Sequence, residues 1–233
     1  MRIDEVPVIA VDGPGGAGKG TVCQALARQL GWHLLDSGAL YRLVALDSMR
    51  ARIDLDDESR VAERARALDV VFAADGRIRL GGDDVTDAIR QEACSQGASR
   101  VAALPAVRSA LIERQRAFRR PPGLVADGRD MGSVVFPGAA VKIFLTASVE
   151  ERARRRYKQL KEKGIDVSLA RLSQELGERD RRDAARAVAP LQATPDAQHL
   201  DTTGLSIDAV VAQVLSWAAA ACPELNLPGN GLD

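Results

Sequence analysis

Short apolar runs alternate along the chain with longer segments in which apolar residues recur every three or four positions. Residues 8–11 form a continuous apolar run that ends at a glycine cluster, which predicts a buried strand. Val22, Leu26 and Leu30 lie four residues apart and predict the helix that Gly31 ends. Further strands are expected at residues 32–35, 124–126, 141–146 and 199–201. Strands that alternate with helices predict an α/β fold with a parallel sheet covered on both faces.

One stretch, residues 53–99, interrupts this alternation. It begins with a helical segment at residues 57–68, and two short strands then flank the hairpin signal Asp75-Gly76. Pro105 follows as a residue well suited to open the next helix. We therefore expect a small α+β insertion between core elements of the sheet.

Two helices in the second half of the chain are expected to form a hairpin over residues 151–186. Ser148 and Glu151 have the spacing of a capping box at the start of the first helix, and the second helix starts near Ser168. An apolar C-terminal helix follows at residues 207–221. The predicted organisation is a core (1–52, 100–150 and 187–222), an insertion (53–99), a helical lid (151–186) and a disordered tail (223–233).

The composition excludes several classes of protein. The 233 residues suffice for one full domain with a smaller attachment. The 32 basic and 32 acidic side chains cancel, which argues against a nucleic-acid partner. No apolar run reaches the roughly 18 residues of a membrane helix, and the acidic N-terminus is unlike a secretory signal. The three isolated cysteines fit a reducing cytoplasm, and we expect a monomer because no apolar surface stripe is left over.

A glycine-rich loop connects the first predicted strand to the first predicted helix. Its sequence, GPGGAGKGT, satisfies Gly-x4-Gly-Lys, although Gly20 displaces the hydroxyl residue to Thr21. Small residues let backbone N–H groups converge on phosphate oxygens, and the helix start adds partial positive charge. Lys19 is expected to reach the β- and γ-phosphates, and Thr21 to ligate Mg²⁺. We therefore expect a nucleoside triphosphate site, and the alternative is an ordinary glycine-rich turn. The residues of the site are Gly13, Pro14, Gly15, Gly16, Ala17, Gly18, Lys19, Gly20 and Thr21.

Two further segments place an arginine just past a strand end, at Arg42 and at Arg129. Ligands of open α/β sheets bind at this edge, and the guanidinium fork suits phosphate. A phosphate monoester acceptor is mostly a dianion at neutral pH and needs no general base. Positioning and charge neutralisation would then carry the rate. The alternatives are a solvated helix residue for Arg42 and a structural ion pair for Arg129.

Asp127 ends the third predicted strand next to this arginine. A carboxylate there is a candidate for a water-mediated contact with Mg²⁺. The alternative is that Asp127 only orients the phosphate loop.

At these residues the chain resembles the bacterial cytidylate kinases. The resemblance rests on GPGGAGKGT, LLDSGALYR, VADGRDMGSVVFP with VKIFLTAS after it, and ERDRRDAARAVAPL, and it extends over residues 8–215. It implies a P-loop kinase fold with a five-stranded parallel sheet, a nucleotide-binding insertion and a mobile lid. The implied reaction is phosphoryl transfer from MgATP to CMP or dCMP, giving ADP and CDP or dCDP.

The resemblance also implies the roles of individual residues. Lys19, Arg129, Arg179 and Arg186 would be catalytic. The acceptor phosphate would lie among Arg42, Arg90 and Arg129; the cytosine would meet Ser99, Arg108 and Asp130, with Arg186 in support; the ribose would meet Tyr41, Arg179 and Asp183; and Ser37 would join the substrate site. A carboxylate accepts from the exocyclic amine of cytosine, whereas uracil presents an acceptor there. The alternatives are a capping role for Asp130 and a helix surface for Ser99 and Arg108.

Several charged residues of the predicted lid are spaced to lie on one helix face. Arg179, Asp183 and Arg186 are four and three residues apart, as neighbours on a helix surface are. Such a face is usually only solvated, but opposite the phosphate loop its arginines would contact the transferring group. Arg152 and Arg156 are further candidates from the first lid helix.

Two other functions fit parts of the sequence. One is a P-loop kinase of another small acceptor, such as a different nucleotide or shikimate. The other is a nucleotide-binding module without transfer activity, against which stand the acceptor-side arginines and an aromatic content of 3%. The size of the insertion resembles bacterial family members, which favours CMP and dCMP over UMP.

Overall fold

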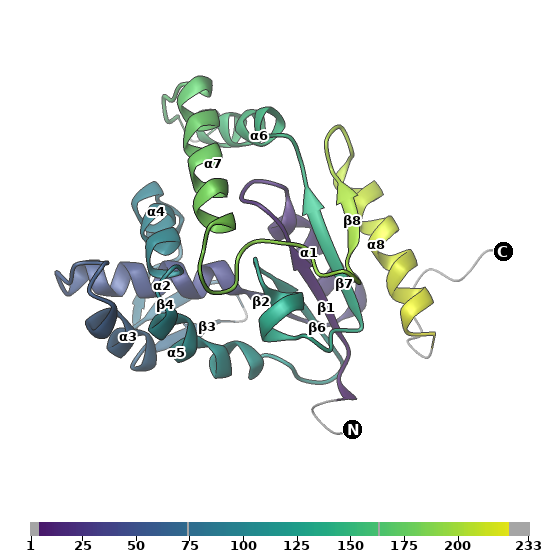
Figure 1. Cartoon of the computed structure of the whole chain (residues 1–233), viewed down its shortest axis with the longest axis horizontal. Coiled ribbons are helices and arrows are strands. Elements are labelled where there is room, and N and C mark those ends of the chain that lie inside the picture. The colour runs from purple at the N-terminus through teal and green to yellow at the C-terminus, as the bar shows by residue number, and fades with distance from the viewer. Residues whose placement is uncertain (1–4, 74, 163, 224–233) are drawn as a thin grey trace. The chain divides into compact units, whose positions relative to one another are not determined.

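The computed structural model in Figure 1 describes residues 5–223 with the exception of residues 74 and 163. The chain divides into two compact units. The larger unit consists of Met1–Leu35 with Phe118–Asp233, and the smaller unit of Asp36–Ala117. The predicted insertion, 53–99, falls inside the smaller unit, which also includes the helices that flank it. The predicted tail lies outside the described residues apart from Pro223.

The larger unit is built on a five-stranded sheet, as the sequence predicts. Its strand order is β2-β6-β1-β7-β8, and β1 pairs in parallel with both β6 and β7, as does β7 with β8. The strands are β1 (Val8–Asp12), β2 (His33–Asp36), β6 (Leu124–Asp127), β7 (Val141–Thr146) and β8 (Gln198–Asp201). Central β1 is buried along its whole length, which explains its continuous apolar run.

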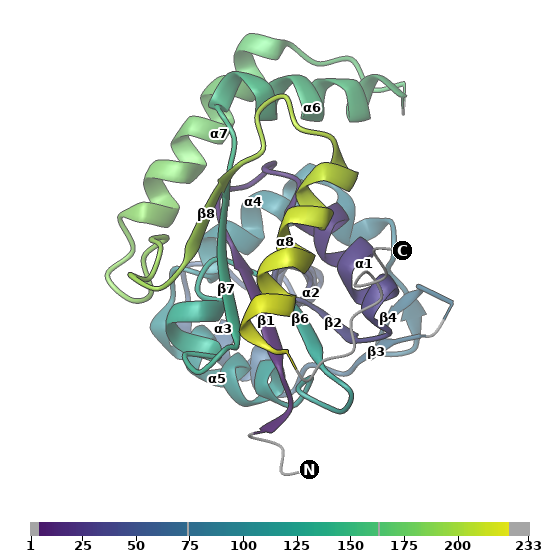
Figure 2. The same cartoon turned by 90° about the vertical axis from the view of Figure 1, so that its right-hand side faces the viewer.

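Helices α1 (Lys19–Leu30) and α8 (Ile207–Ala221) pack together on one face of this sheet (Figure 2). Val22 and Leu26 of α1 and Val214 of α8 belong to one buried cluster with side chains of β1 and β7 such as Ile143. Alternate residues of β7 are buried here because side chains of a strand point to opposite faces in turn. This core holds β1 and α1 firmly on either side of the glycine-rich loop.

Helices α6 (Val149–Glu162) and α7 (Leu169–Ala184) form the predicted hairpin. Ser148 Oγ accepts from the Glu151 N–H at 3.1 Å, which is one half of a capping box. The prediction of the second bond, from the Ser148 N–H to the Glu151 carboxylate, is wrong. The Ser148 N–H donates to Thr203 Oγ1 at 3.1 Å instead, and the Glu151 carboxylate pairs with Arg155.

The smaller unit packs four helices beside a three-stranded antiparallel sheet. Its elements are α2 (Ser37–Arg50), α3 (Glu58–Arg66), β3 (Val70–Phe72), β4 (Ile78–Leu80), β5 (Asp83–Asp84), the 3₁₀ turn η2 (Ala88–Arg90), α4 (Glu92–Val101) and α5 (Pro105–Arg116). The predicted hairpin and the helix opened by Pro105 are present. Helix α4 was not predicted, because most of its buried positions are small residues and Gln91 provides no side-chain cap. One of them, Gly97, lets α4 approach α2, since a Cβ there would lie 3.0 Å from the Ala45 Cβ.

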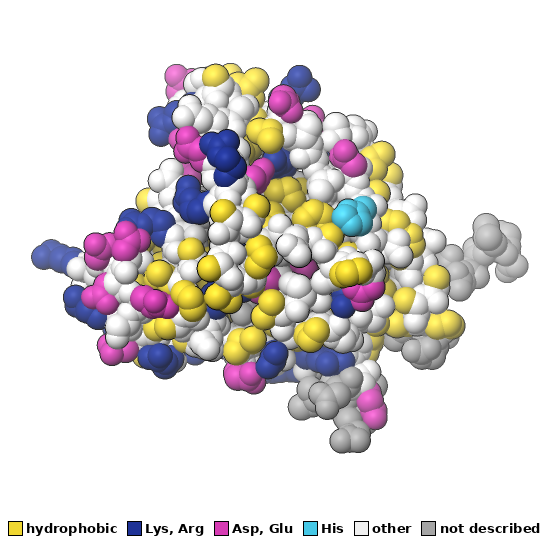
Figure 3. Space-filling view, viewed as in Figure 1, with side chains coloured by type: hydrophobic (Ala, Val, Ile, Leu, Met, Phe, Trp, Pro, Cys, Tyr) yellow, Lys and Arg dark blue, Asp and Glu magenta, His cyan; other side chains and the backbone are white. Residues whose placement is uncertain are grey.

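Charges of opposite sign are interspersed on the outer surface of the smaller unit (Figure 3). The smaller unit contains ion pairs of Arg64 with Asp47 and of Arg50 with Asp83. The described residues also contain no helix that is long and apolar enough to cross a membrane.

Gly13 follows β1 at a point where the backbone of β7 comes so close that only a glycine fits. Its φ is +145°, and a Cβ added there would lie 1.9 Å from the carbonyl oxygen of Leu145 on β7. We expect Gly13→Ala to lower the free energy of unfolding by about 3 kcal/mol or more, because the backbone of β7 has to move. Chemical denaturation of the whole chain measures this loss.

Gly15→Ala is the matched control. A Cβ at Gly15 would meet only side-chain atoms at ordinary distance, the nearest being Arg129 Nη2 at 3.4 Å. Its loss should stay below about 1 kcal/mol. Equal losses for the two variants would contradict the assignment of Gly13 to a steric requirement.

Candidate active site

The glycine-rich loop leads from the carboxyl end of β1 directly into α1. Gly18 occupies the N-cap position in a left-handed conformation, and Lys19 is the first residue of the helix. The first N–H groups of a helix have no partner within it and carry partial positive charge. The loop and this helix end together form the concave, N–H-rich surface that suits a phosphate group.

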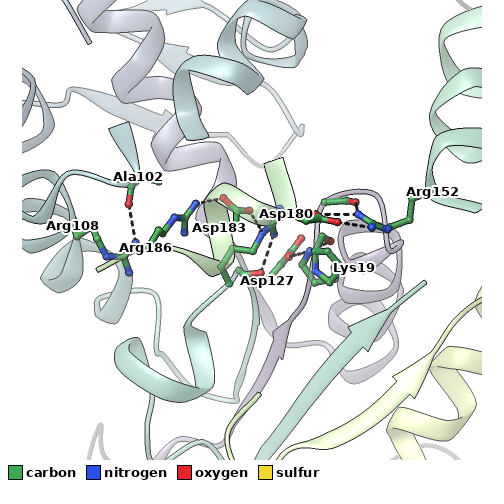
Figure 4. Close-up of polar contacts among 12 residues, drawn as sticks. Lys19, Ala102, Arg108, Asp127, Arg152, Asp180, Asp183 and Arg186 are labelled. Atoms are coloured by element: carbon green, nitrogen blue, oxygen red, sulfur yellow. Dashed lines mark hydrogen bonds and ion pairs between the residues drawn. The ribbon is translucent and has the colours of Figure 1, made fainter. Parts of the chain in front are cut away.

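Lys19 lies within this loop with only 5% of its side chain exposed. Its Nζ donates to the Pro14 carbonyl at 3.0 Å and lies 3.8 Å from Asp127 Oδ1, as Figure 4 shows. Burial and the nearby charge of Arg129 lower the pKa of Lys19 to about 8, although Asp127 opposes the shift. An anion bound beside the ammonium group would therefore stabilise its charged form.

The residues expected to hold Mg²⁺ supply oxygen atoms of the right kind. Thr21 is exposed on the first turn of α1, and Asp127 Oδ2 would lie 3.6 Å from a Cβ at the adjacent Gly20. A hydroxyl and a carboxylate are hard ligands, and Mg²⁺ is usually held by one or two protein groups together with phosphate and water. The residues present therefore fit this ion.

Asp12, at the end of β1, is a buried carboxylate that the sequence reasoning did not assign. Its two oxygens accept from the N–H groups of Met131 and Gly132, both at 2.8 Å. Burial raises the pKa of Asp12 to about 6, although both hydrogen bonds oppose the shift. This pair of bonds fixes the start of the π-helical turn η3 (Met131–Val135), directly after Arg129 and Asp130. The sequence signal that could have identified Asp12 is its position as a single carboxylate at the end of an otherwise apolar strand.

The predicted catalytic arginines of the larger unit gather around one aspartate. Asp183 is 1% exposed, accepts from Arg129 Nε at 3.1 Å and also pairs with Arg186. Burial would raise the pKa of Asp183, but the charges of Arg129, Arg186 and Arg179 together outweigh it and hold the pKa below its usual value. A Cβ at Gly15 would lie 3.4 Å from Arg129 Nη2 and 3.6 Å from Arg179 Nη1. Two guanidinium groups therefore lie beside the phosphate loop.

One part of this prediction is wrong. Arg179 and Asp183 share α7, but the helix ends at Ala184, so Arg186 does not continue its face. Arg186 nevertheless reaches the same carboxylate from the segment after the helix (Figure 4). The ion pair of Arg129 with Asp183 also realises the structural alternative considered for Arg129.

Asp130 is buried at the N-cap position of η3, where its side chain makes no capping hydrogen bond. The alternative of a simple cap for the following turn is therefore not realised.

The remaining substrate-binding candidates belong to the smaller unit. Asp36 caps α2 by accepting from the Ala39 N–H at 2.8 Å, and its second oxygen pairs with Arg42 at 2.8 Å. The Arg42 side chain is thus held along α2 rather than fully solvated. Ser37 is buried as the first residue of the helix, and Arg90 is exposed at the end of η2.

Three candidates line the interior of this unit. The Arg108 guanidinium lies over the Tyr41 ring at 5.9 Å from its centroid and donates to the Ala102 carbonyl at 3.2 Å (Figure 4). Ser99 is buried, and its Oγ has no hydrogen-bond partner among the residues that the structure describes. Arg108 and Ser99 therefore do not form a helix surface, which was the alternative for both.

The chain is similar to known proteins over most of its length. The family model of cytidylate kinases matches residues 9–220. A cytidylate kinase from Pseudomonas aeruginosa (strain UCBPP-PA14) is 61% identical over 215 residues, which cover 90% of this chain and 94% of that protein. One from Aeromonas salmonicida (strain A449) is 57% identical over 215 residues, with 91% and 94% covered. A gluconokinase from Sinorhizobium meliloti 1021 shares the fold, with a TM-score of 0.50 at 17% identity over 96% of this chain and 97% of that one. Because the family model spans nearly the whole chain and these relatives are so similar along it, the chain belongs to the cytidylate kinase family.

Proposed function

We propose that this protein transfers the γ-phosphoryl group of MgATP to CMP or dCMP, giving ADP and CDP or dCDP. The observation that carries the proposal is the position of Lys19, Arg129 and Arg179 around the phosphate loop. Phosphoryl transfer requires a donor and an acceptor that are both anionic to approach each other, and three cations beside one loop reduce their repulsion.

The chemistry needs few groups from the protein. The acceptor phosphate is mostly a dianion at neutral pH and can attack without a general base. Arg129, Arg179 and Arg186 would stabilise the charge that spreads over the transferring group. Thr21 and Asp127 would hold Mg²⁺, which neutralises charge on the donor phosphates when it is bound. Lys19 would bind the β- and γ-phosphates directly.

Choice of the acceptor is assigned to three buried polar residues. Asp130 would accept from the exocyclic amine of cytosine, and Ser99 and Arg108 would bind the remaining polar edge of the base. The buried Ser99 Oγ, which has no hydrogen-bond partner in the described part of the chain, supports this role, because a buried hydroxyl without a partner is costly unless a ligand satisfies it. Arg42 and Arg90 would bind the acceptor phosphate. Ser37, Tyr41 and Asp183 complete the substrate site, and we assign the enzyme to the cytoplasm as a monomer without nucleic-acid or membrane partners.

A panel of acceptors tests the reaction. ADP release from MgATP should accelerate with CMP and dCMP, and far less with UMP, AMP or shikimate. A coupled spectrophotometric assay measures each rate under the same conditions. Release that is independent of every acceptor, or fastest with shikimate, would contradict the proposal.

Lys19 should make ATP binding depend on pH. The pKa of about 8 lies below that of an ordinary lysine, so the ammonium loses its proton as pH rises through 8. Because phosphates bind the charged form, kcat/KM for ATP should fall above this pH, and ADP binding at pH 8.5 should take up a proton. Calorimetry in buffers of different ionisation enthalpy measures the uptake.

Two substitutions of the same residue serve as controls. In Lys19→Arg the guanidinium stays charged, so the break near pH 8 should disappear. Lys19→Ala should lose about 100-fold or more of turnover, whereas half of the wild-type rate would rule out this role.

Asp130→Asn should relax the choice of base. The amide can donate where the carboxylate only accepts, so the ratio of kcat/KM between CMP and UMP should fall by about tenfold or more. Affinity for ADP should not change, because the substitution leaves the phosphate loop intact. An unchanged ratio would remove Asp130 from the base site.

A further inference from the structure

Arg152 of α6 is a buried arginine with four side-chain hydrogen bonds, and it is not part of the proposed chemistry. Its side chain is 3% exposed. Nε donates to the Ala147 carbonyl at 2.9 Å, Nη1 to the Gly15 carbonyl at 2.9 Å, and both Nη atoms face the Asp180 carboxylate (Figure 4). One guanidinium thus joins the start of α6, the phosphate loop and α7.

The bond to Gly15 bears on the direction of a neighbouring N–H group. In a trans peptide the C=O of one residue and the N–H of the next point in opposite directions. Because Arg152 holds the Gly15 carbonyl, the N–H of Gly16 points away from Arg152. Backbone N–H groups of a glycine-rich loop are the groups that bind phosphate, so this direction bears on the donor site.

Packing around Gly16 independently places the aliphatic part of Arg152 against the loop. A Cβ at Gly16 would lie 3.2 Å from the Cβ and 3.6 Å from the Cγ of Arg152. The aliphatic part of Arg152 therefore contacts the loop at the same peptide that its head group binds. Both contacts restrict the rotation of this peptide.

A second carbonyl of the loop is held in the same way. The Ala17 carbonyl accepts from Thr202 Oγ1 at 3.1 Å, and Arg155, one turn after Arg152, donates to the Thr202 hydroxyl and carbonyl at 3.1 and 2.7 Å. By the same geometry, this bond directs the N–H of Gly18 away from Thr202. Helix α6 therefore supports two peptides of the loop, directly through Arg152 at residues 15–16 and by way of Arg155 and Thr202 at residues 17–18.

We infer that Arg152 is a positioning residue of the donor site, oriented by Asp180, which aims the Gly16 N–H at the donor phosphates by holding the Gly15 carbonyl. The inference rests on the proposed binding of ATP at this loop. Arg152 acts through the backbone and does not itself bind phosphate. Its four donor–acceptor contacts need the fixed fork of a guanidinium, which a lysine cannot reproduce.

Arg152→Lys separates this role from direct phosphate binding. Lysine keeps the charge, so a direct phosphate ligand would lose less than about twofold in ADP affinity, because lysine binds phosphate well as a point charge. A positioning residue would lose about tenfold or more, with a matching rise in KM for ATP and little change in KM for CMP. Calorimetric titration with ADP measures the affinity. Retained affinity in Arg152→Lys would overturn the inference.

Asp180→Asn gives a second, opposite prediction and decides the matter if Arg152→Lys does not fold. If Asp180 orients Arg152, its loss should weaken ADP binding several-fold. If Arg152 bound phosphate directly, removing a competing carboxylate would strengthen binding, and that result would overturn the inference. Arg154→Lys, on an exposed position of the same helix, is the matched control and should stay within about twofold of wild type.

The backbone itself provides a readout that loss of stability alone would not move. In ¹H–¹⁵N spectra of the nucleotide-free protein, Arg152→Lys should shift the Gly16 amide while amides of α8 stay in place. An unshifted Gly16 amide would contradict the inference. Because ADP binding and these spectra require neither acceptor nor turnover, the inference can fail while CMP phosphorylation is observed, and the reverse.

Discussion

Cations gathered around an anion-binding loop repel one another, and the structure of the larger unit depends on how that repulsion is offset. Lys19, Arg129 and Arg179 lie around the same few residues of the loop, and burial, followed by the charges of Arg129 and Arg179, lowers the pKa of Lys19. Three aspartates provide the opposing charge: Asp127 faces Lys19, Asp180 faces Arg152, and Asp183 faces Arg129 and Arg186. Removing one of them would leave buried positive charge uncompensated, which is costly in a protein interior.

These carboxylates also determine where the cations point. Asp180 and Asp183 lie three residues apart on α7, so one helix orients arginines that come from α6, from the end of β6 and from the segment after α7 itself. A polyanionic ligand then meets guanidinium groups that are already desolvated and oriented. Preorganisation of this kind lowers the cost of binding and of charge redistribution during phosphoryl transfer.

Asp12 orients part of the backbone, as the other aspartates orient cationic side chains. Its two hydrogen bonds hold the N–H groups of Met131 and Gly132 at the end of β1, and so fix the chain just after Arg129 and Asp130. The raised pKa of this carboxyl reflects the cost of burying it. A charge buried at such a cost is consistent with a positional role for the residues that it anchors.

The sequence by itself determined the elements whose signals are local. The apolar run of β1, the four-residue stripe of α1, the glycine loop between them and Pro105 at the start of α5 were all legible, because each depends on a few adjacent residues. Helix α4 and strand β5 were not, since the buried positions of α4 are mostly small residues and both residues of β5 are exposed, so neither element gives a strong apolar signal. The family motifs likewise indicated Arg129, Arg179 and Asp183, yet not that Arg186 lies beyond the helix. Among the neighbouring arginines of α6, only the tertiary structure decided that Arg152 reaches the loop while Arg154 faces solvent. The physical reason is that the sequence lists the charged residues of a helix, whereas the way the helix is rotated as it packs against its neighbours decides which of them are buried.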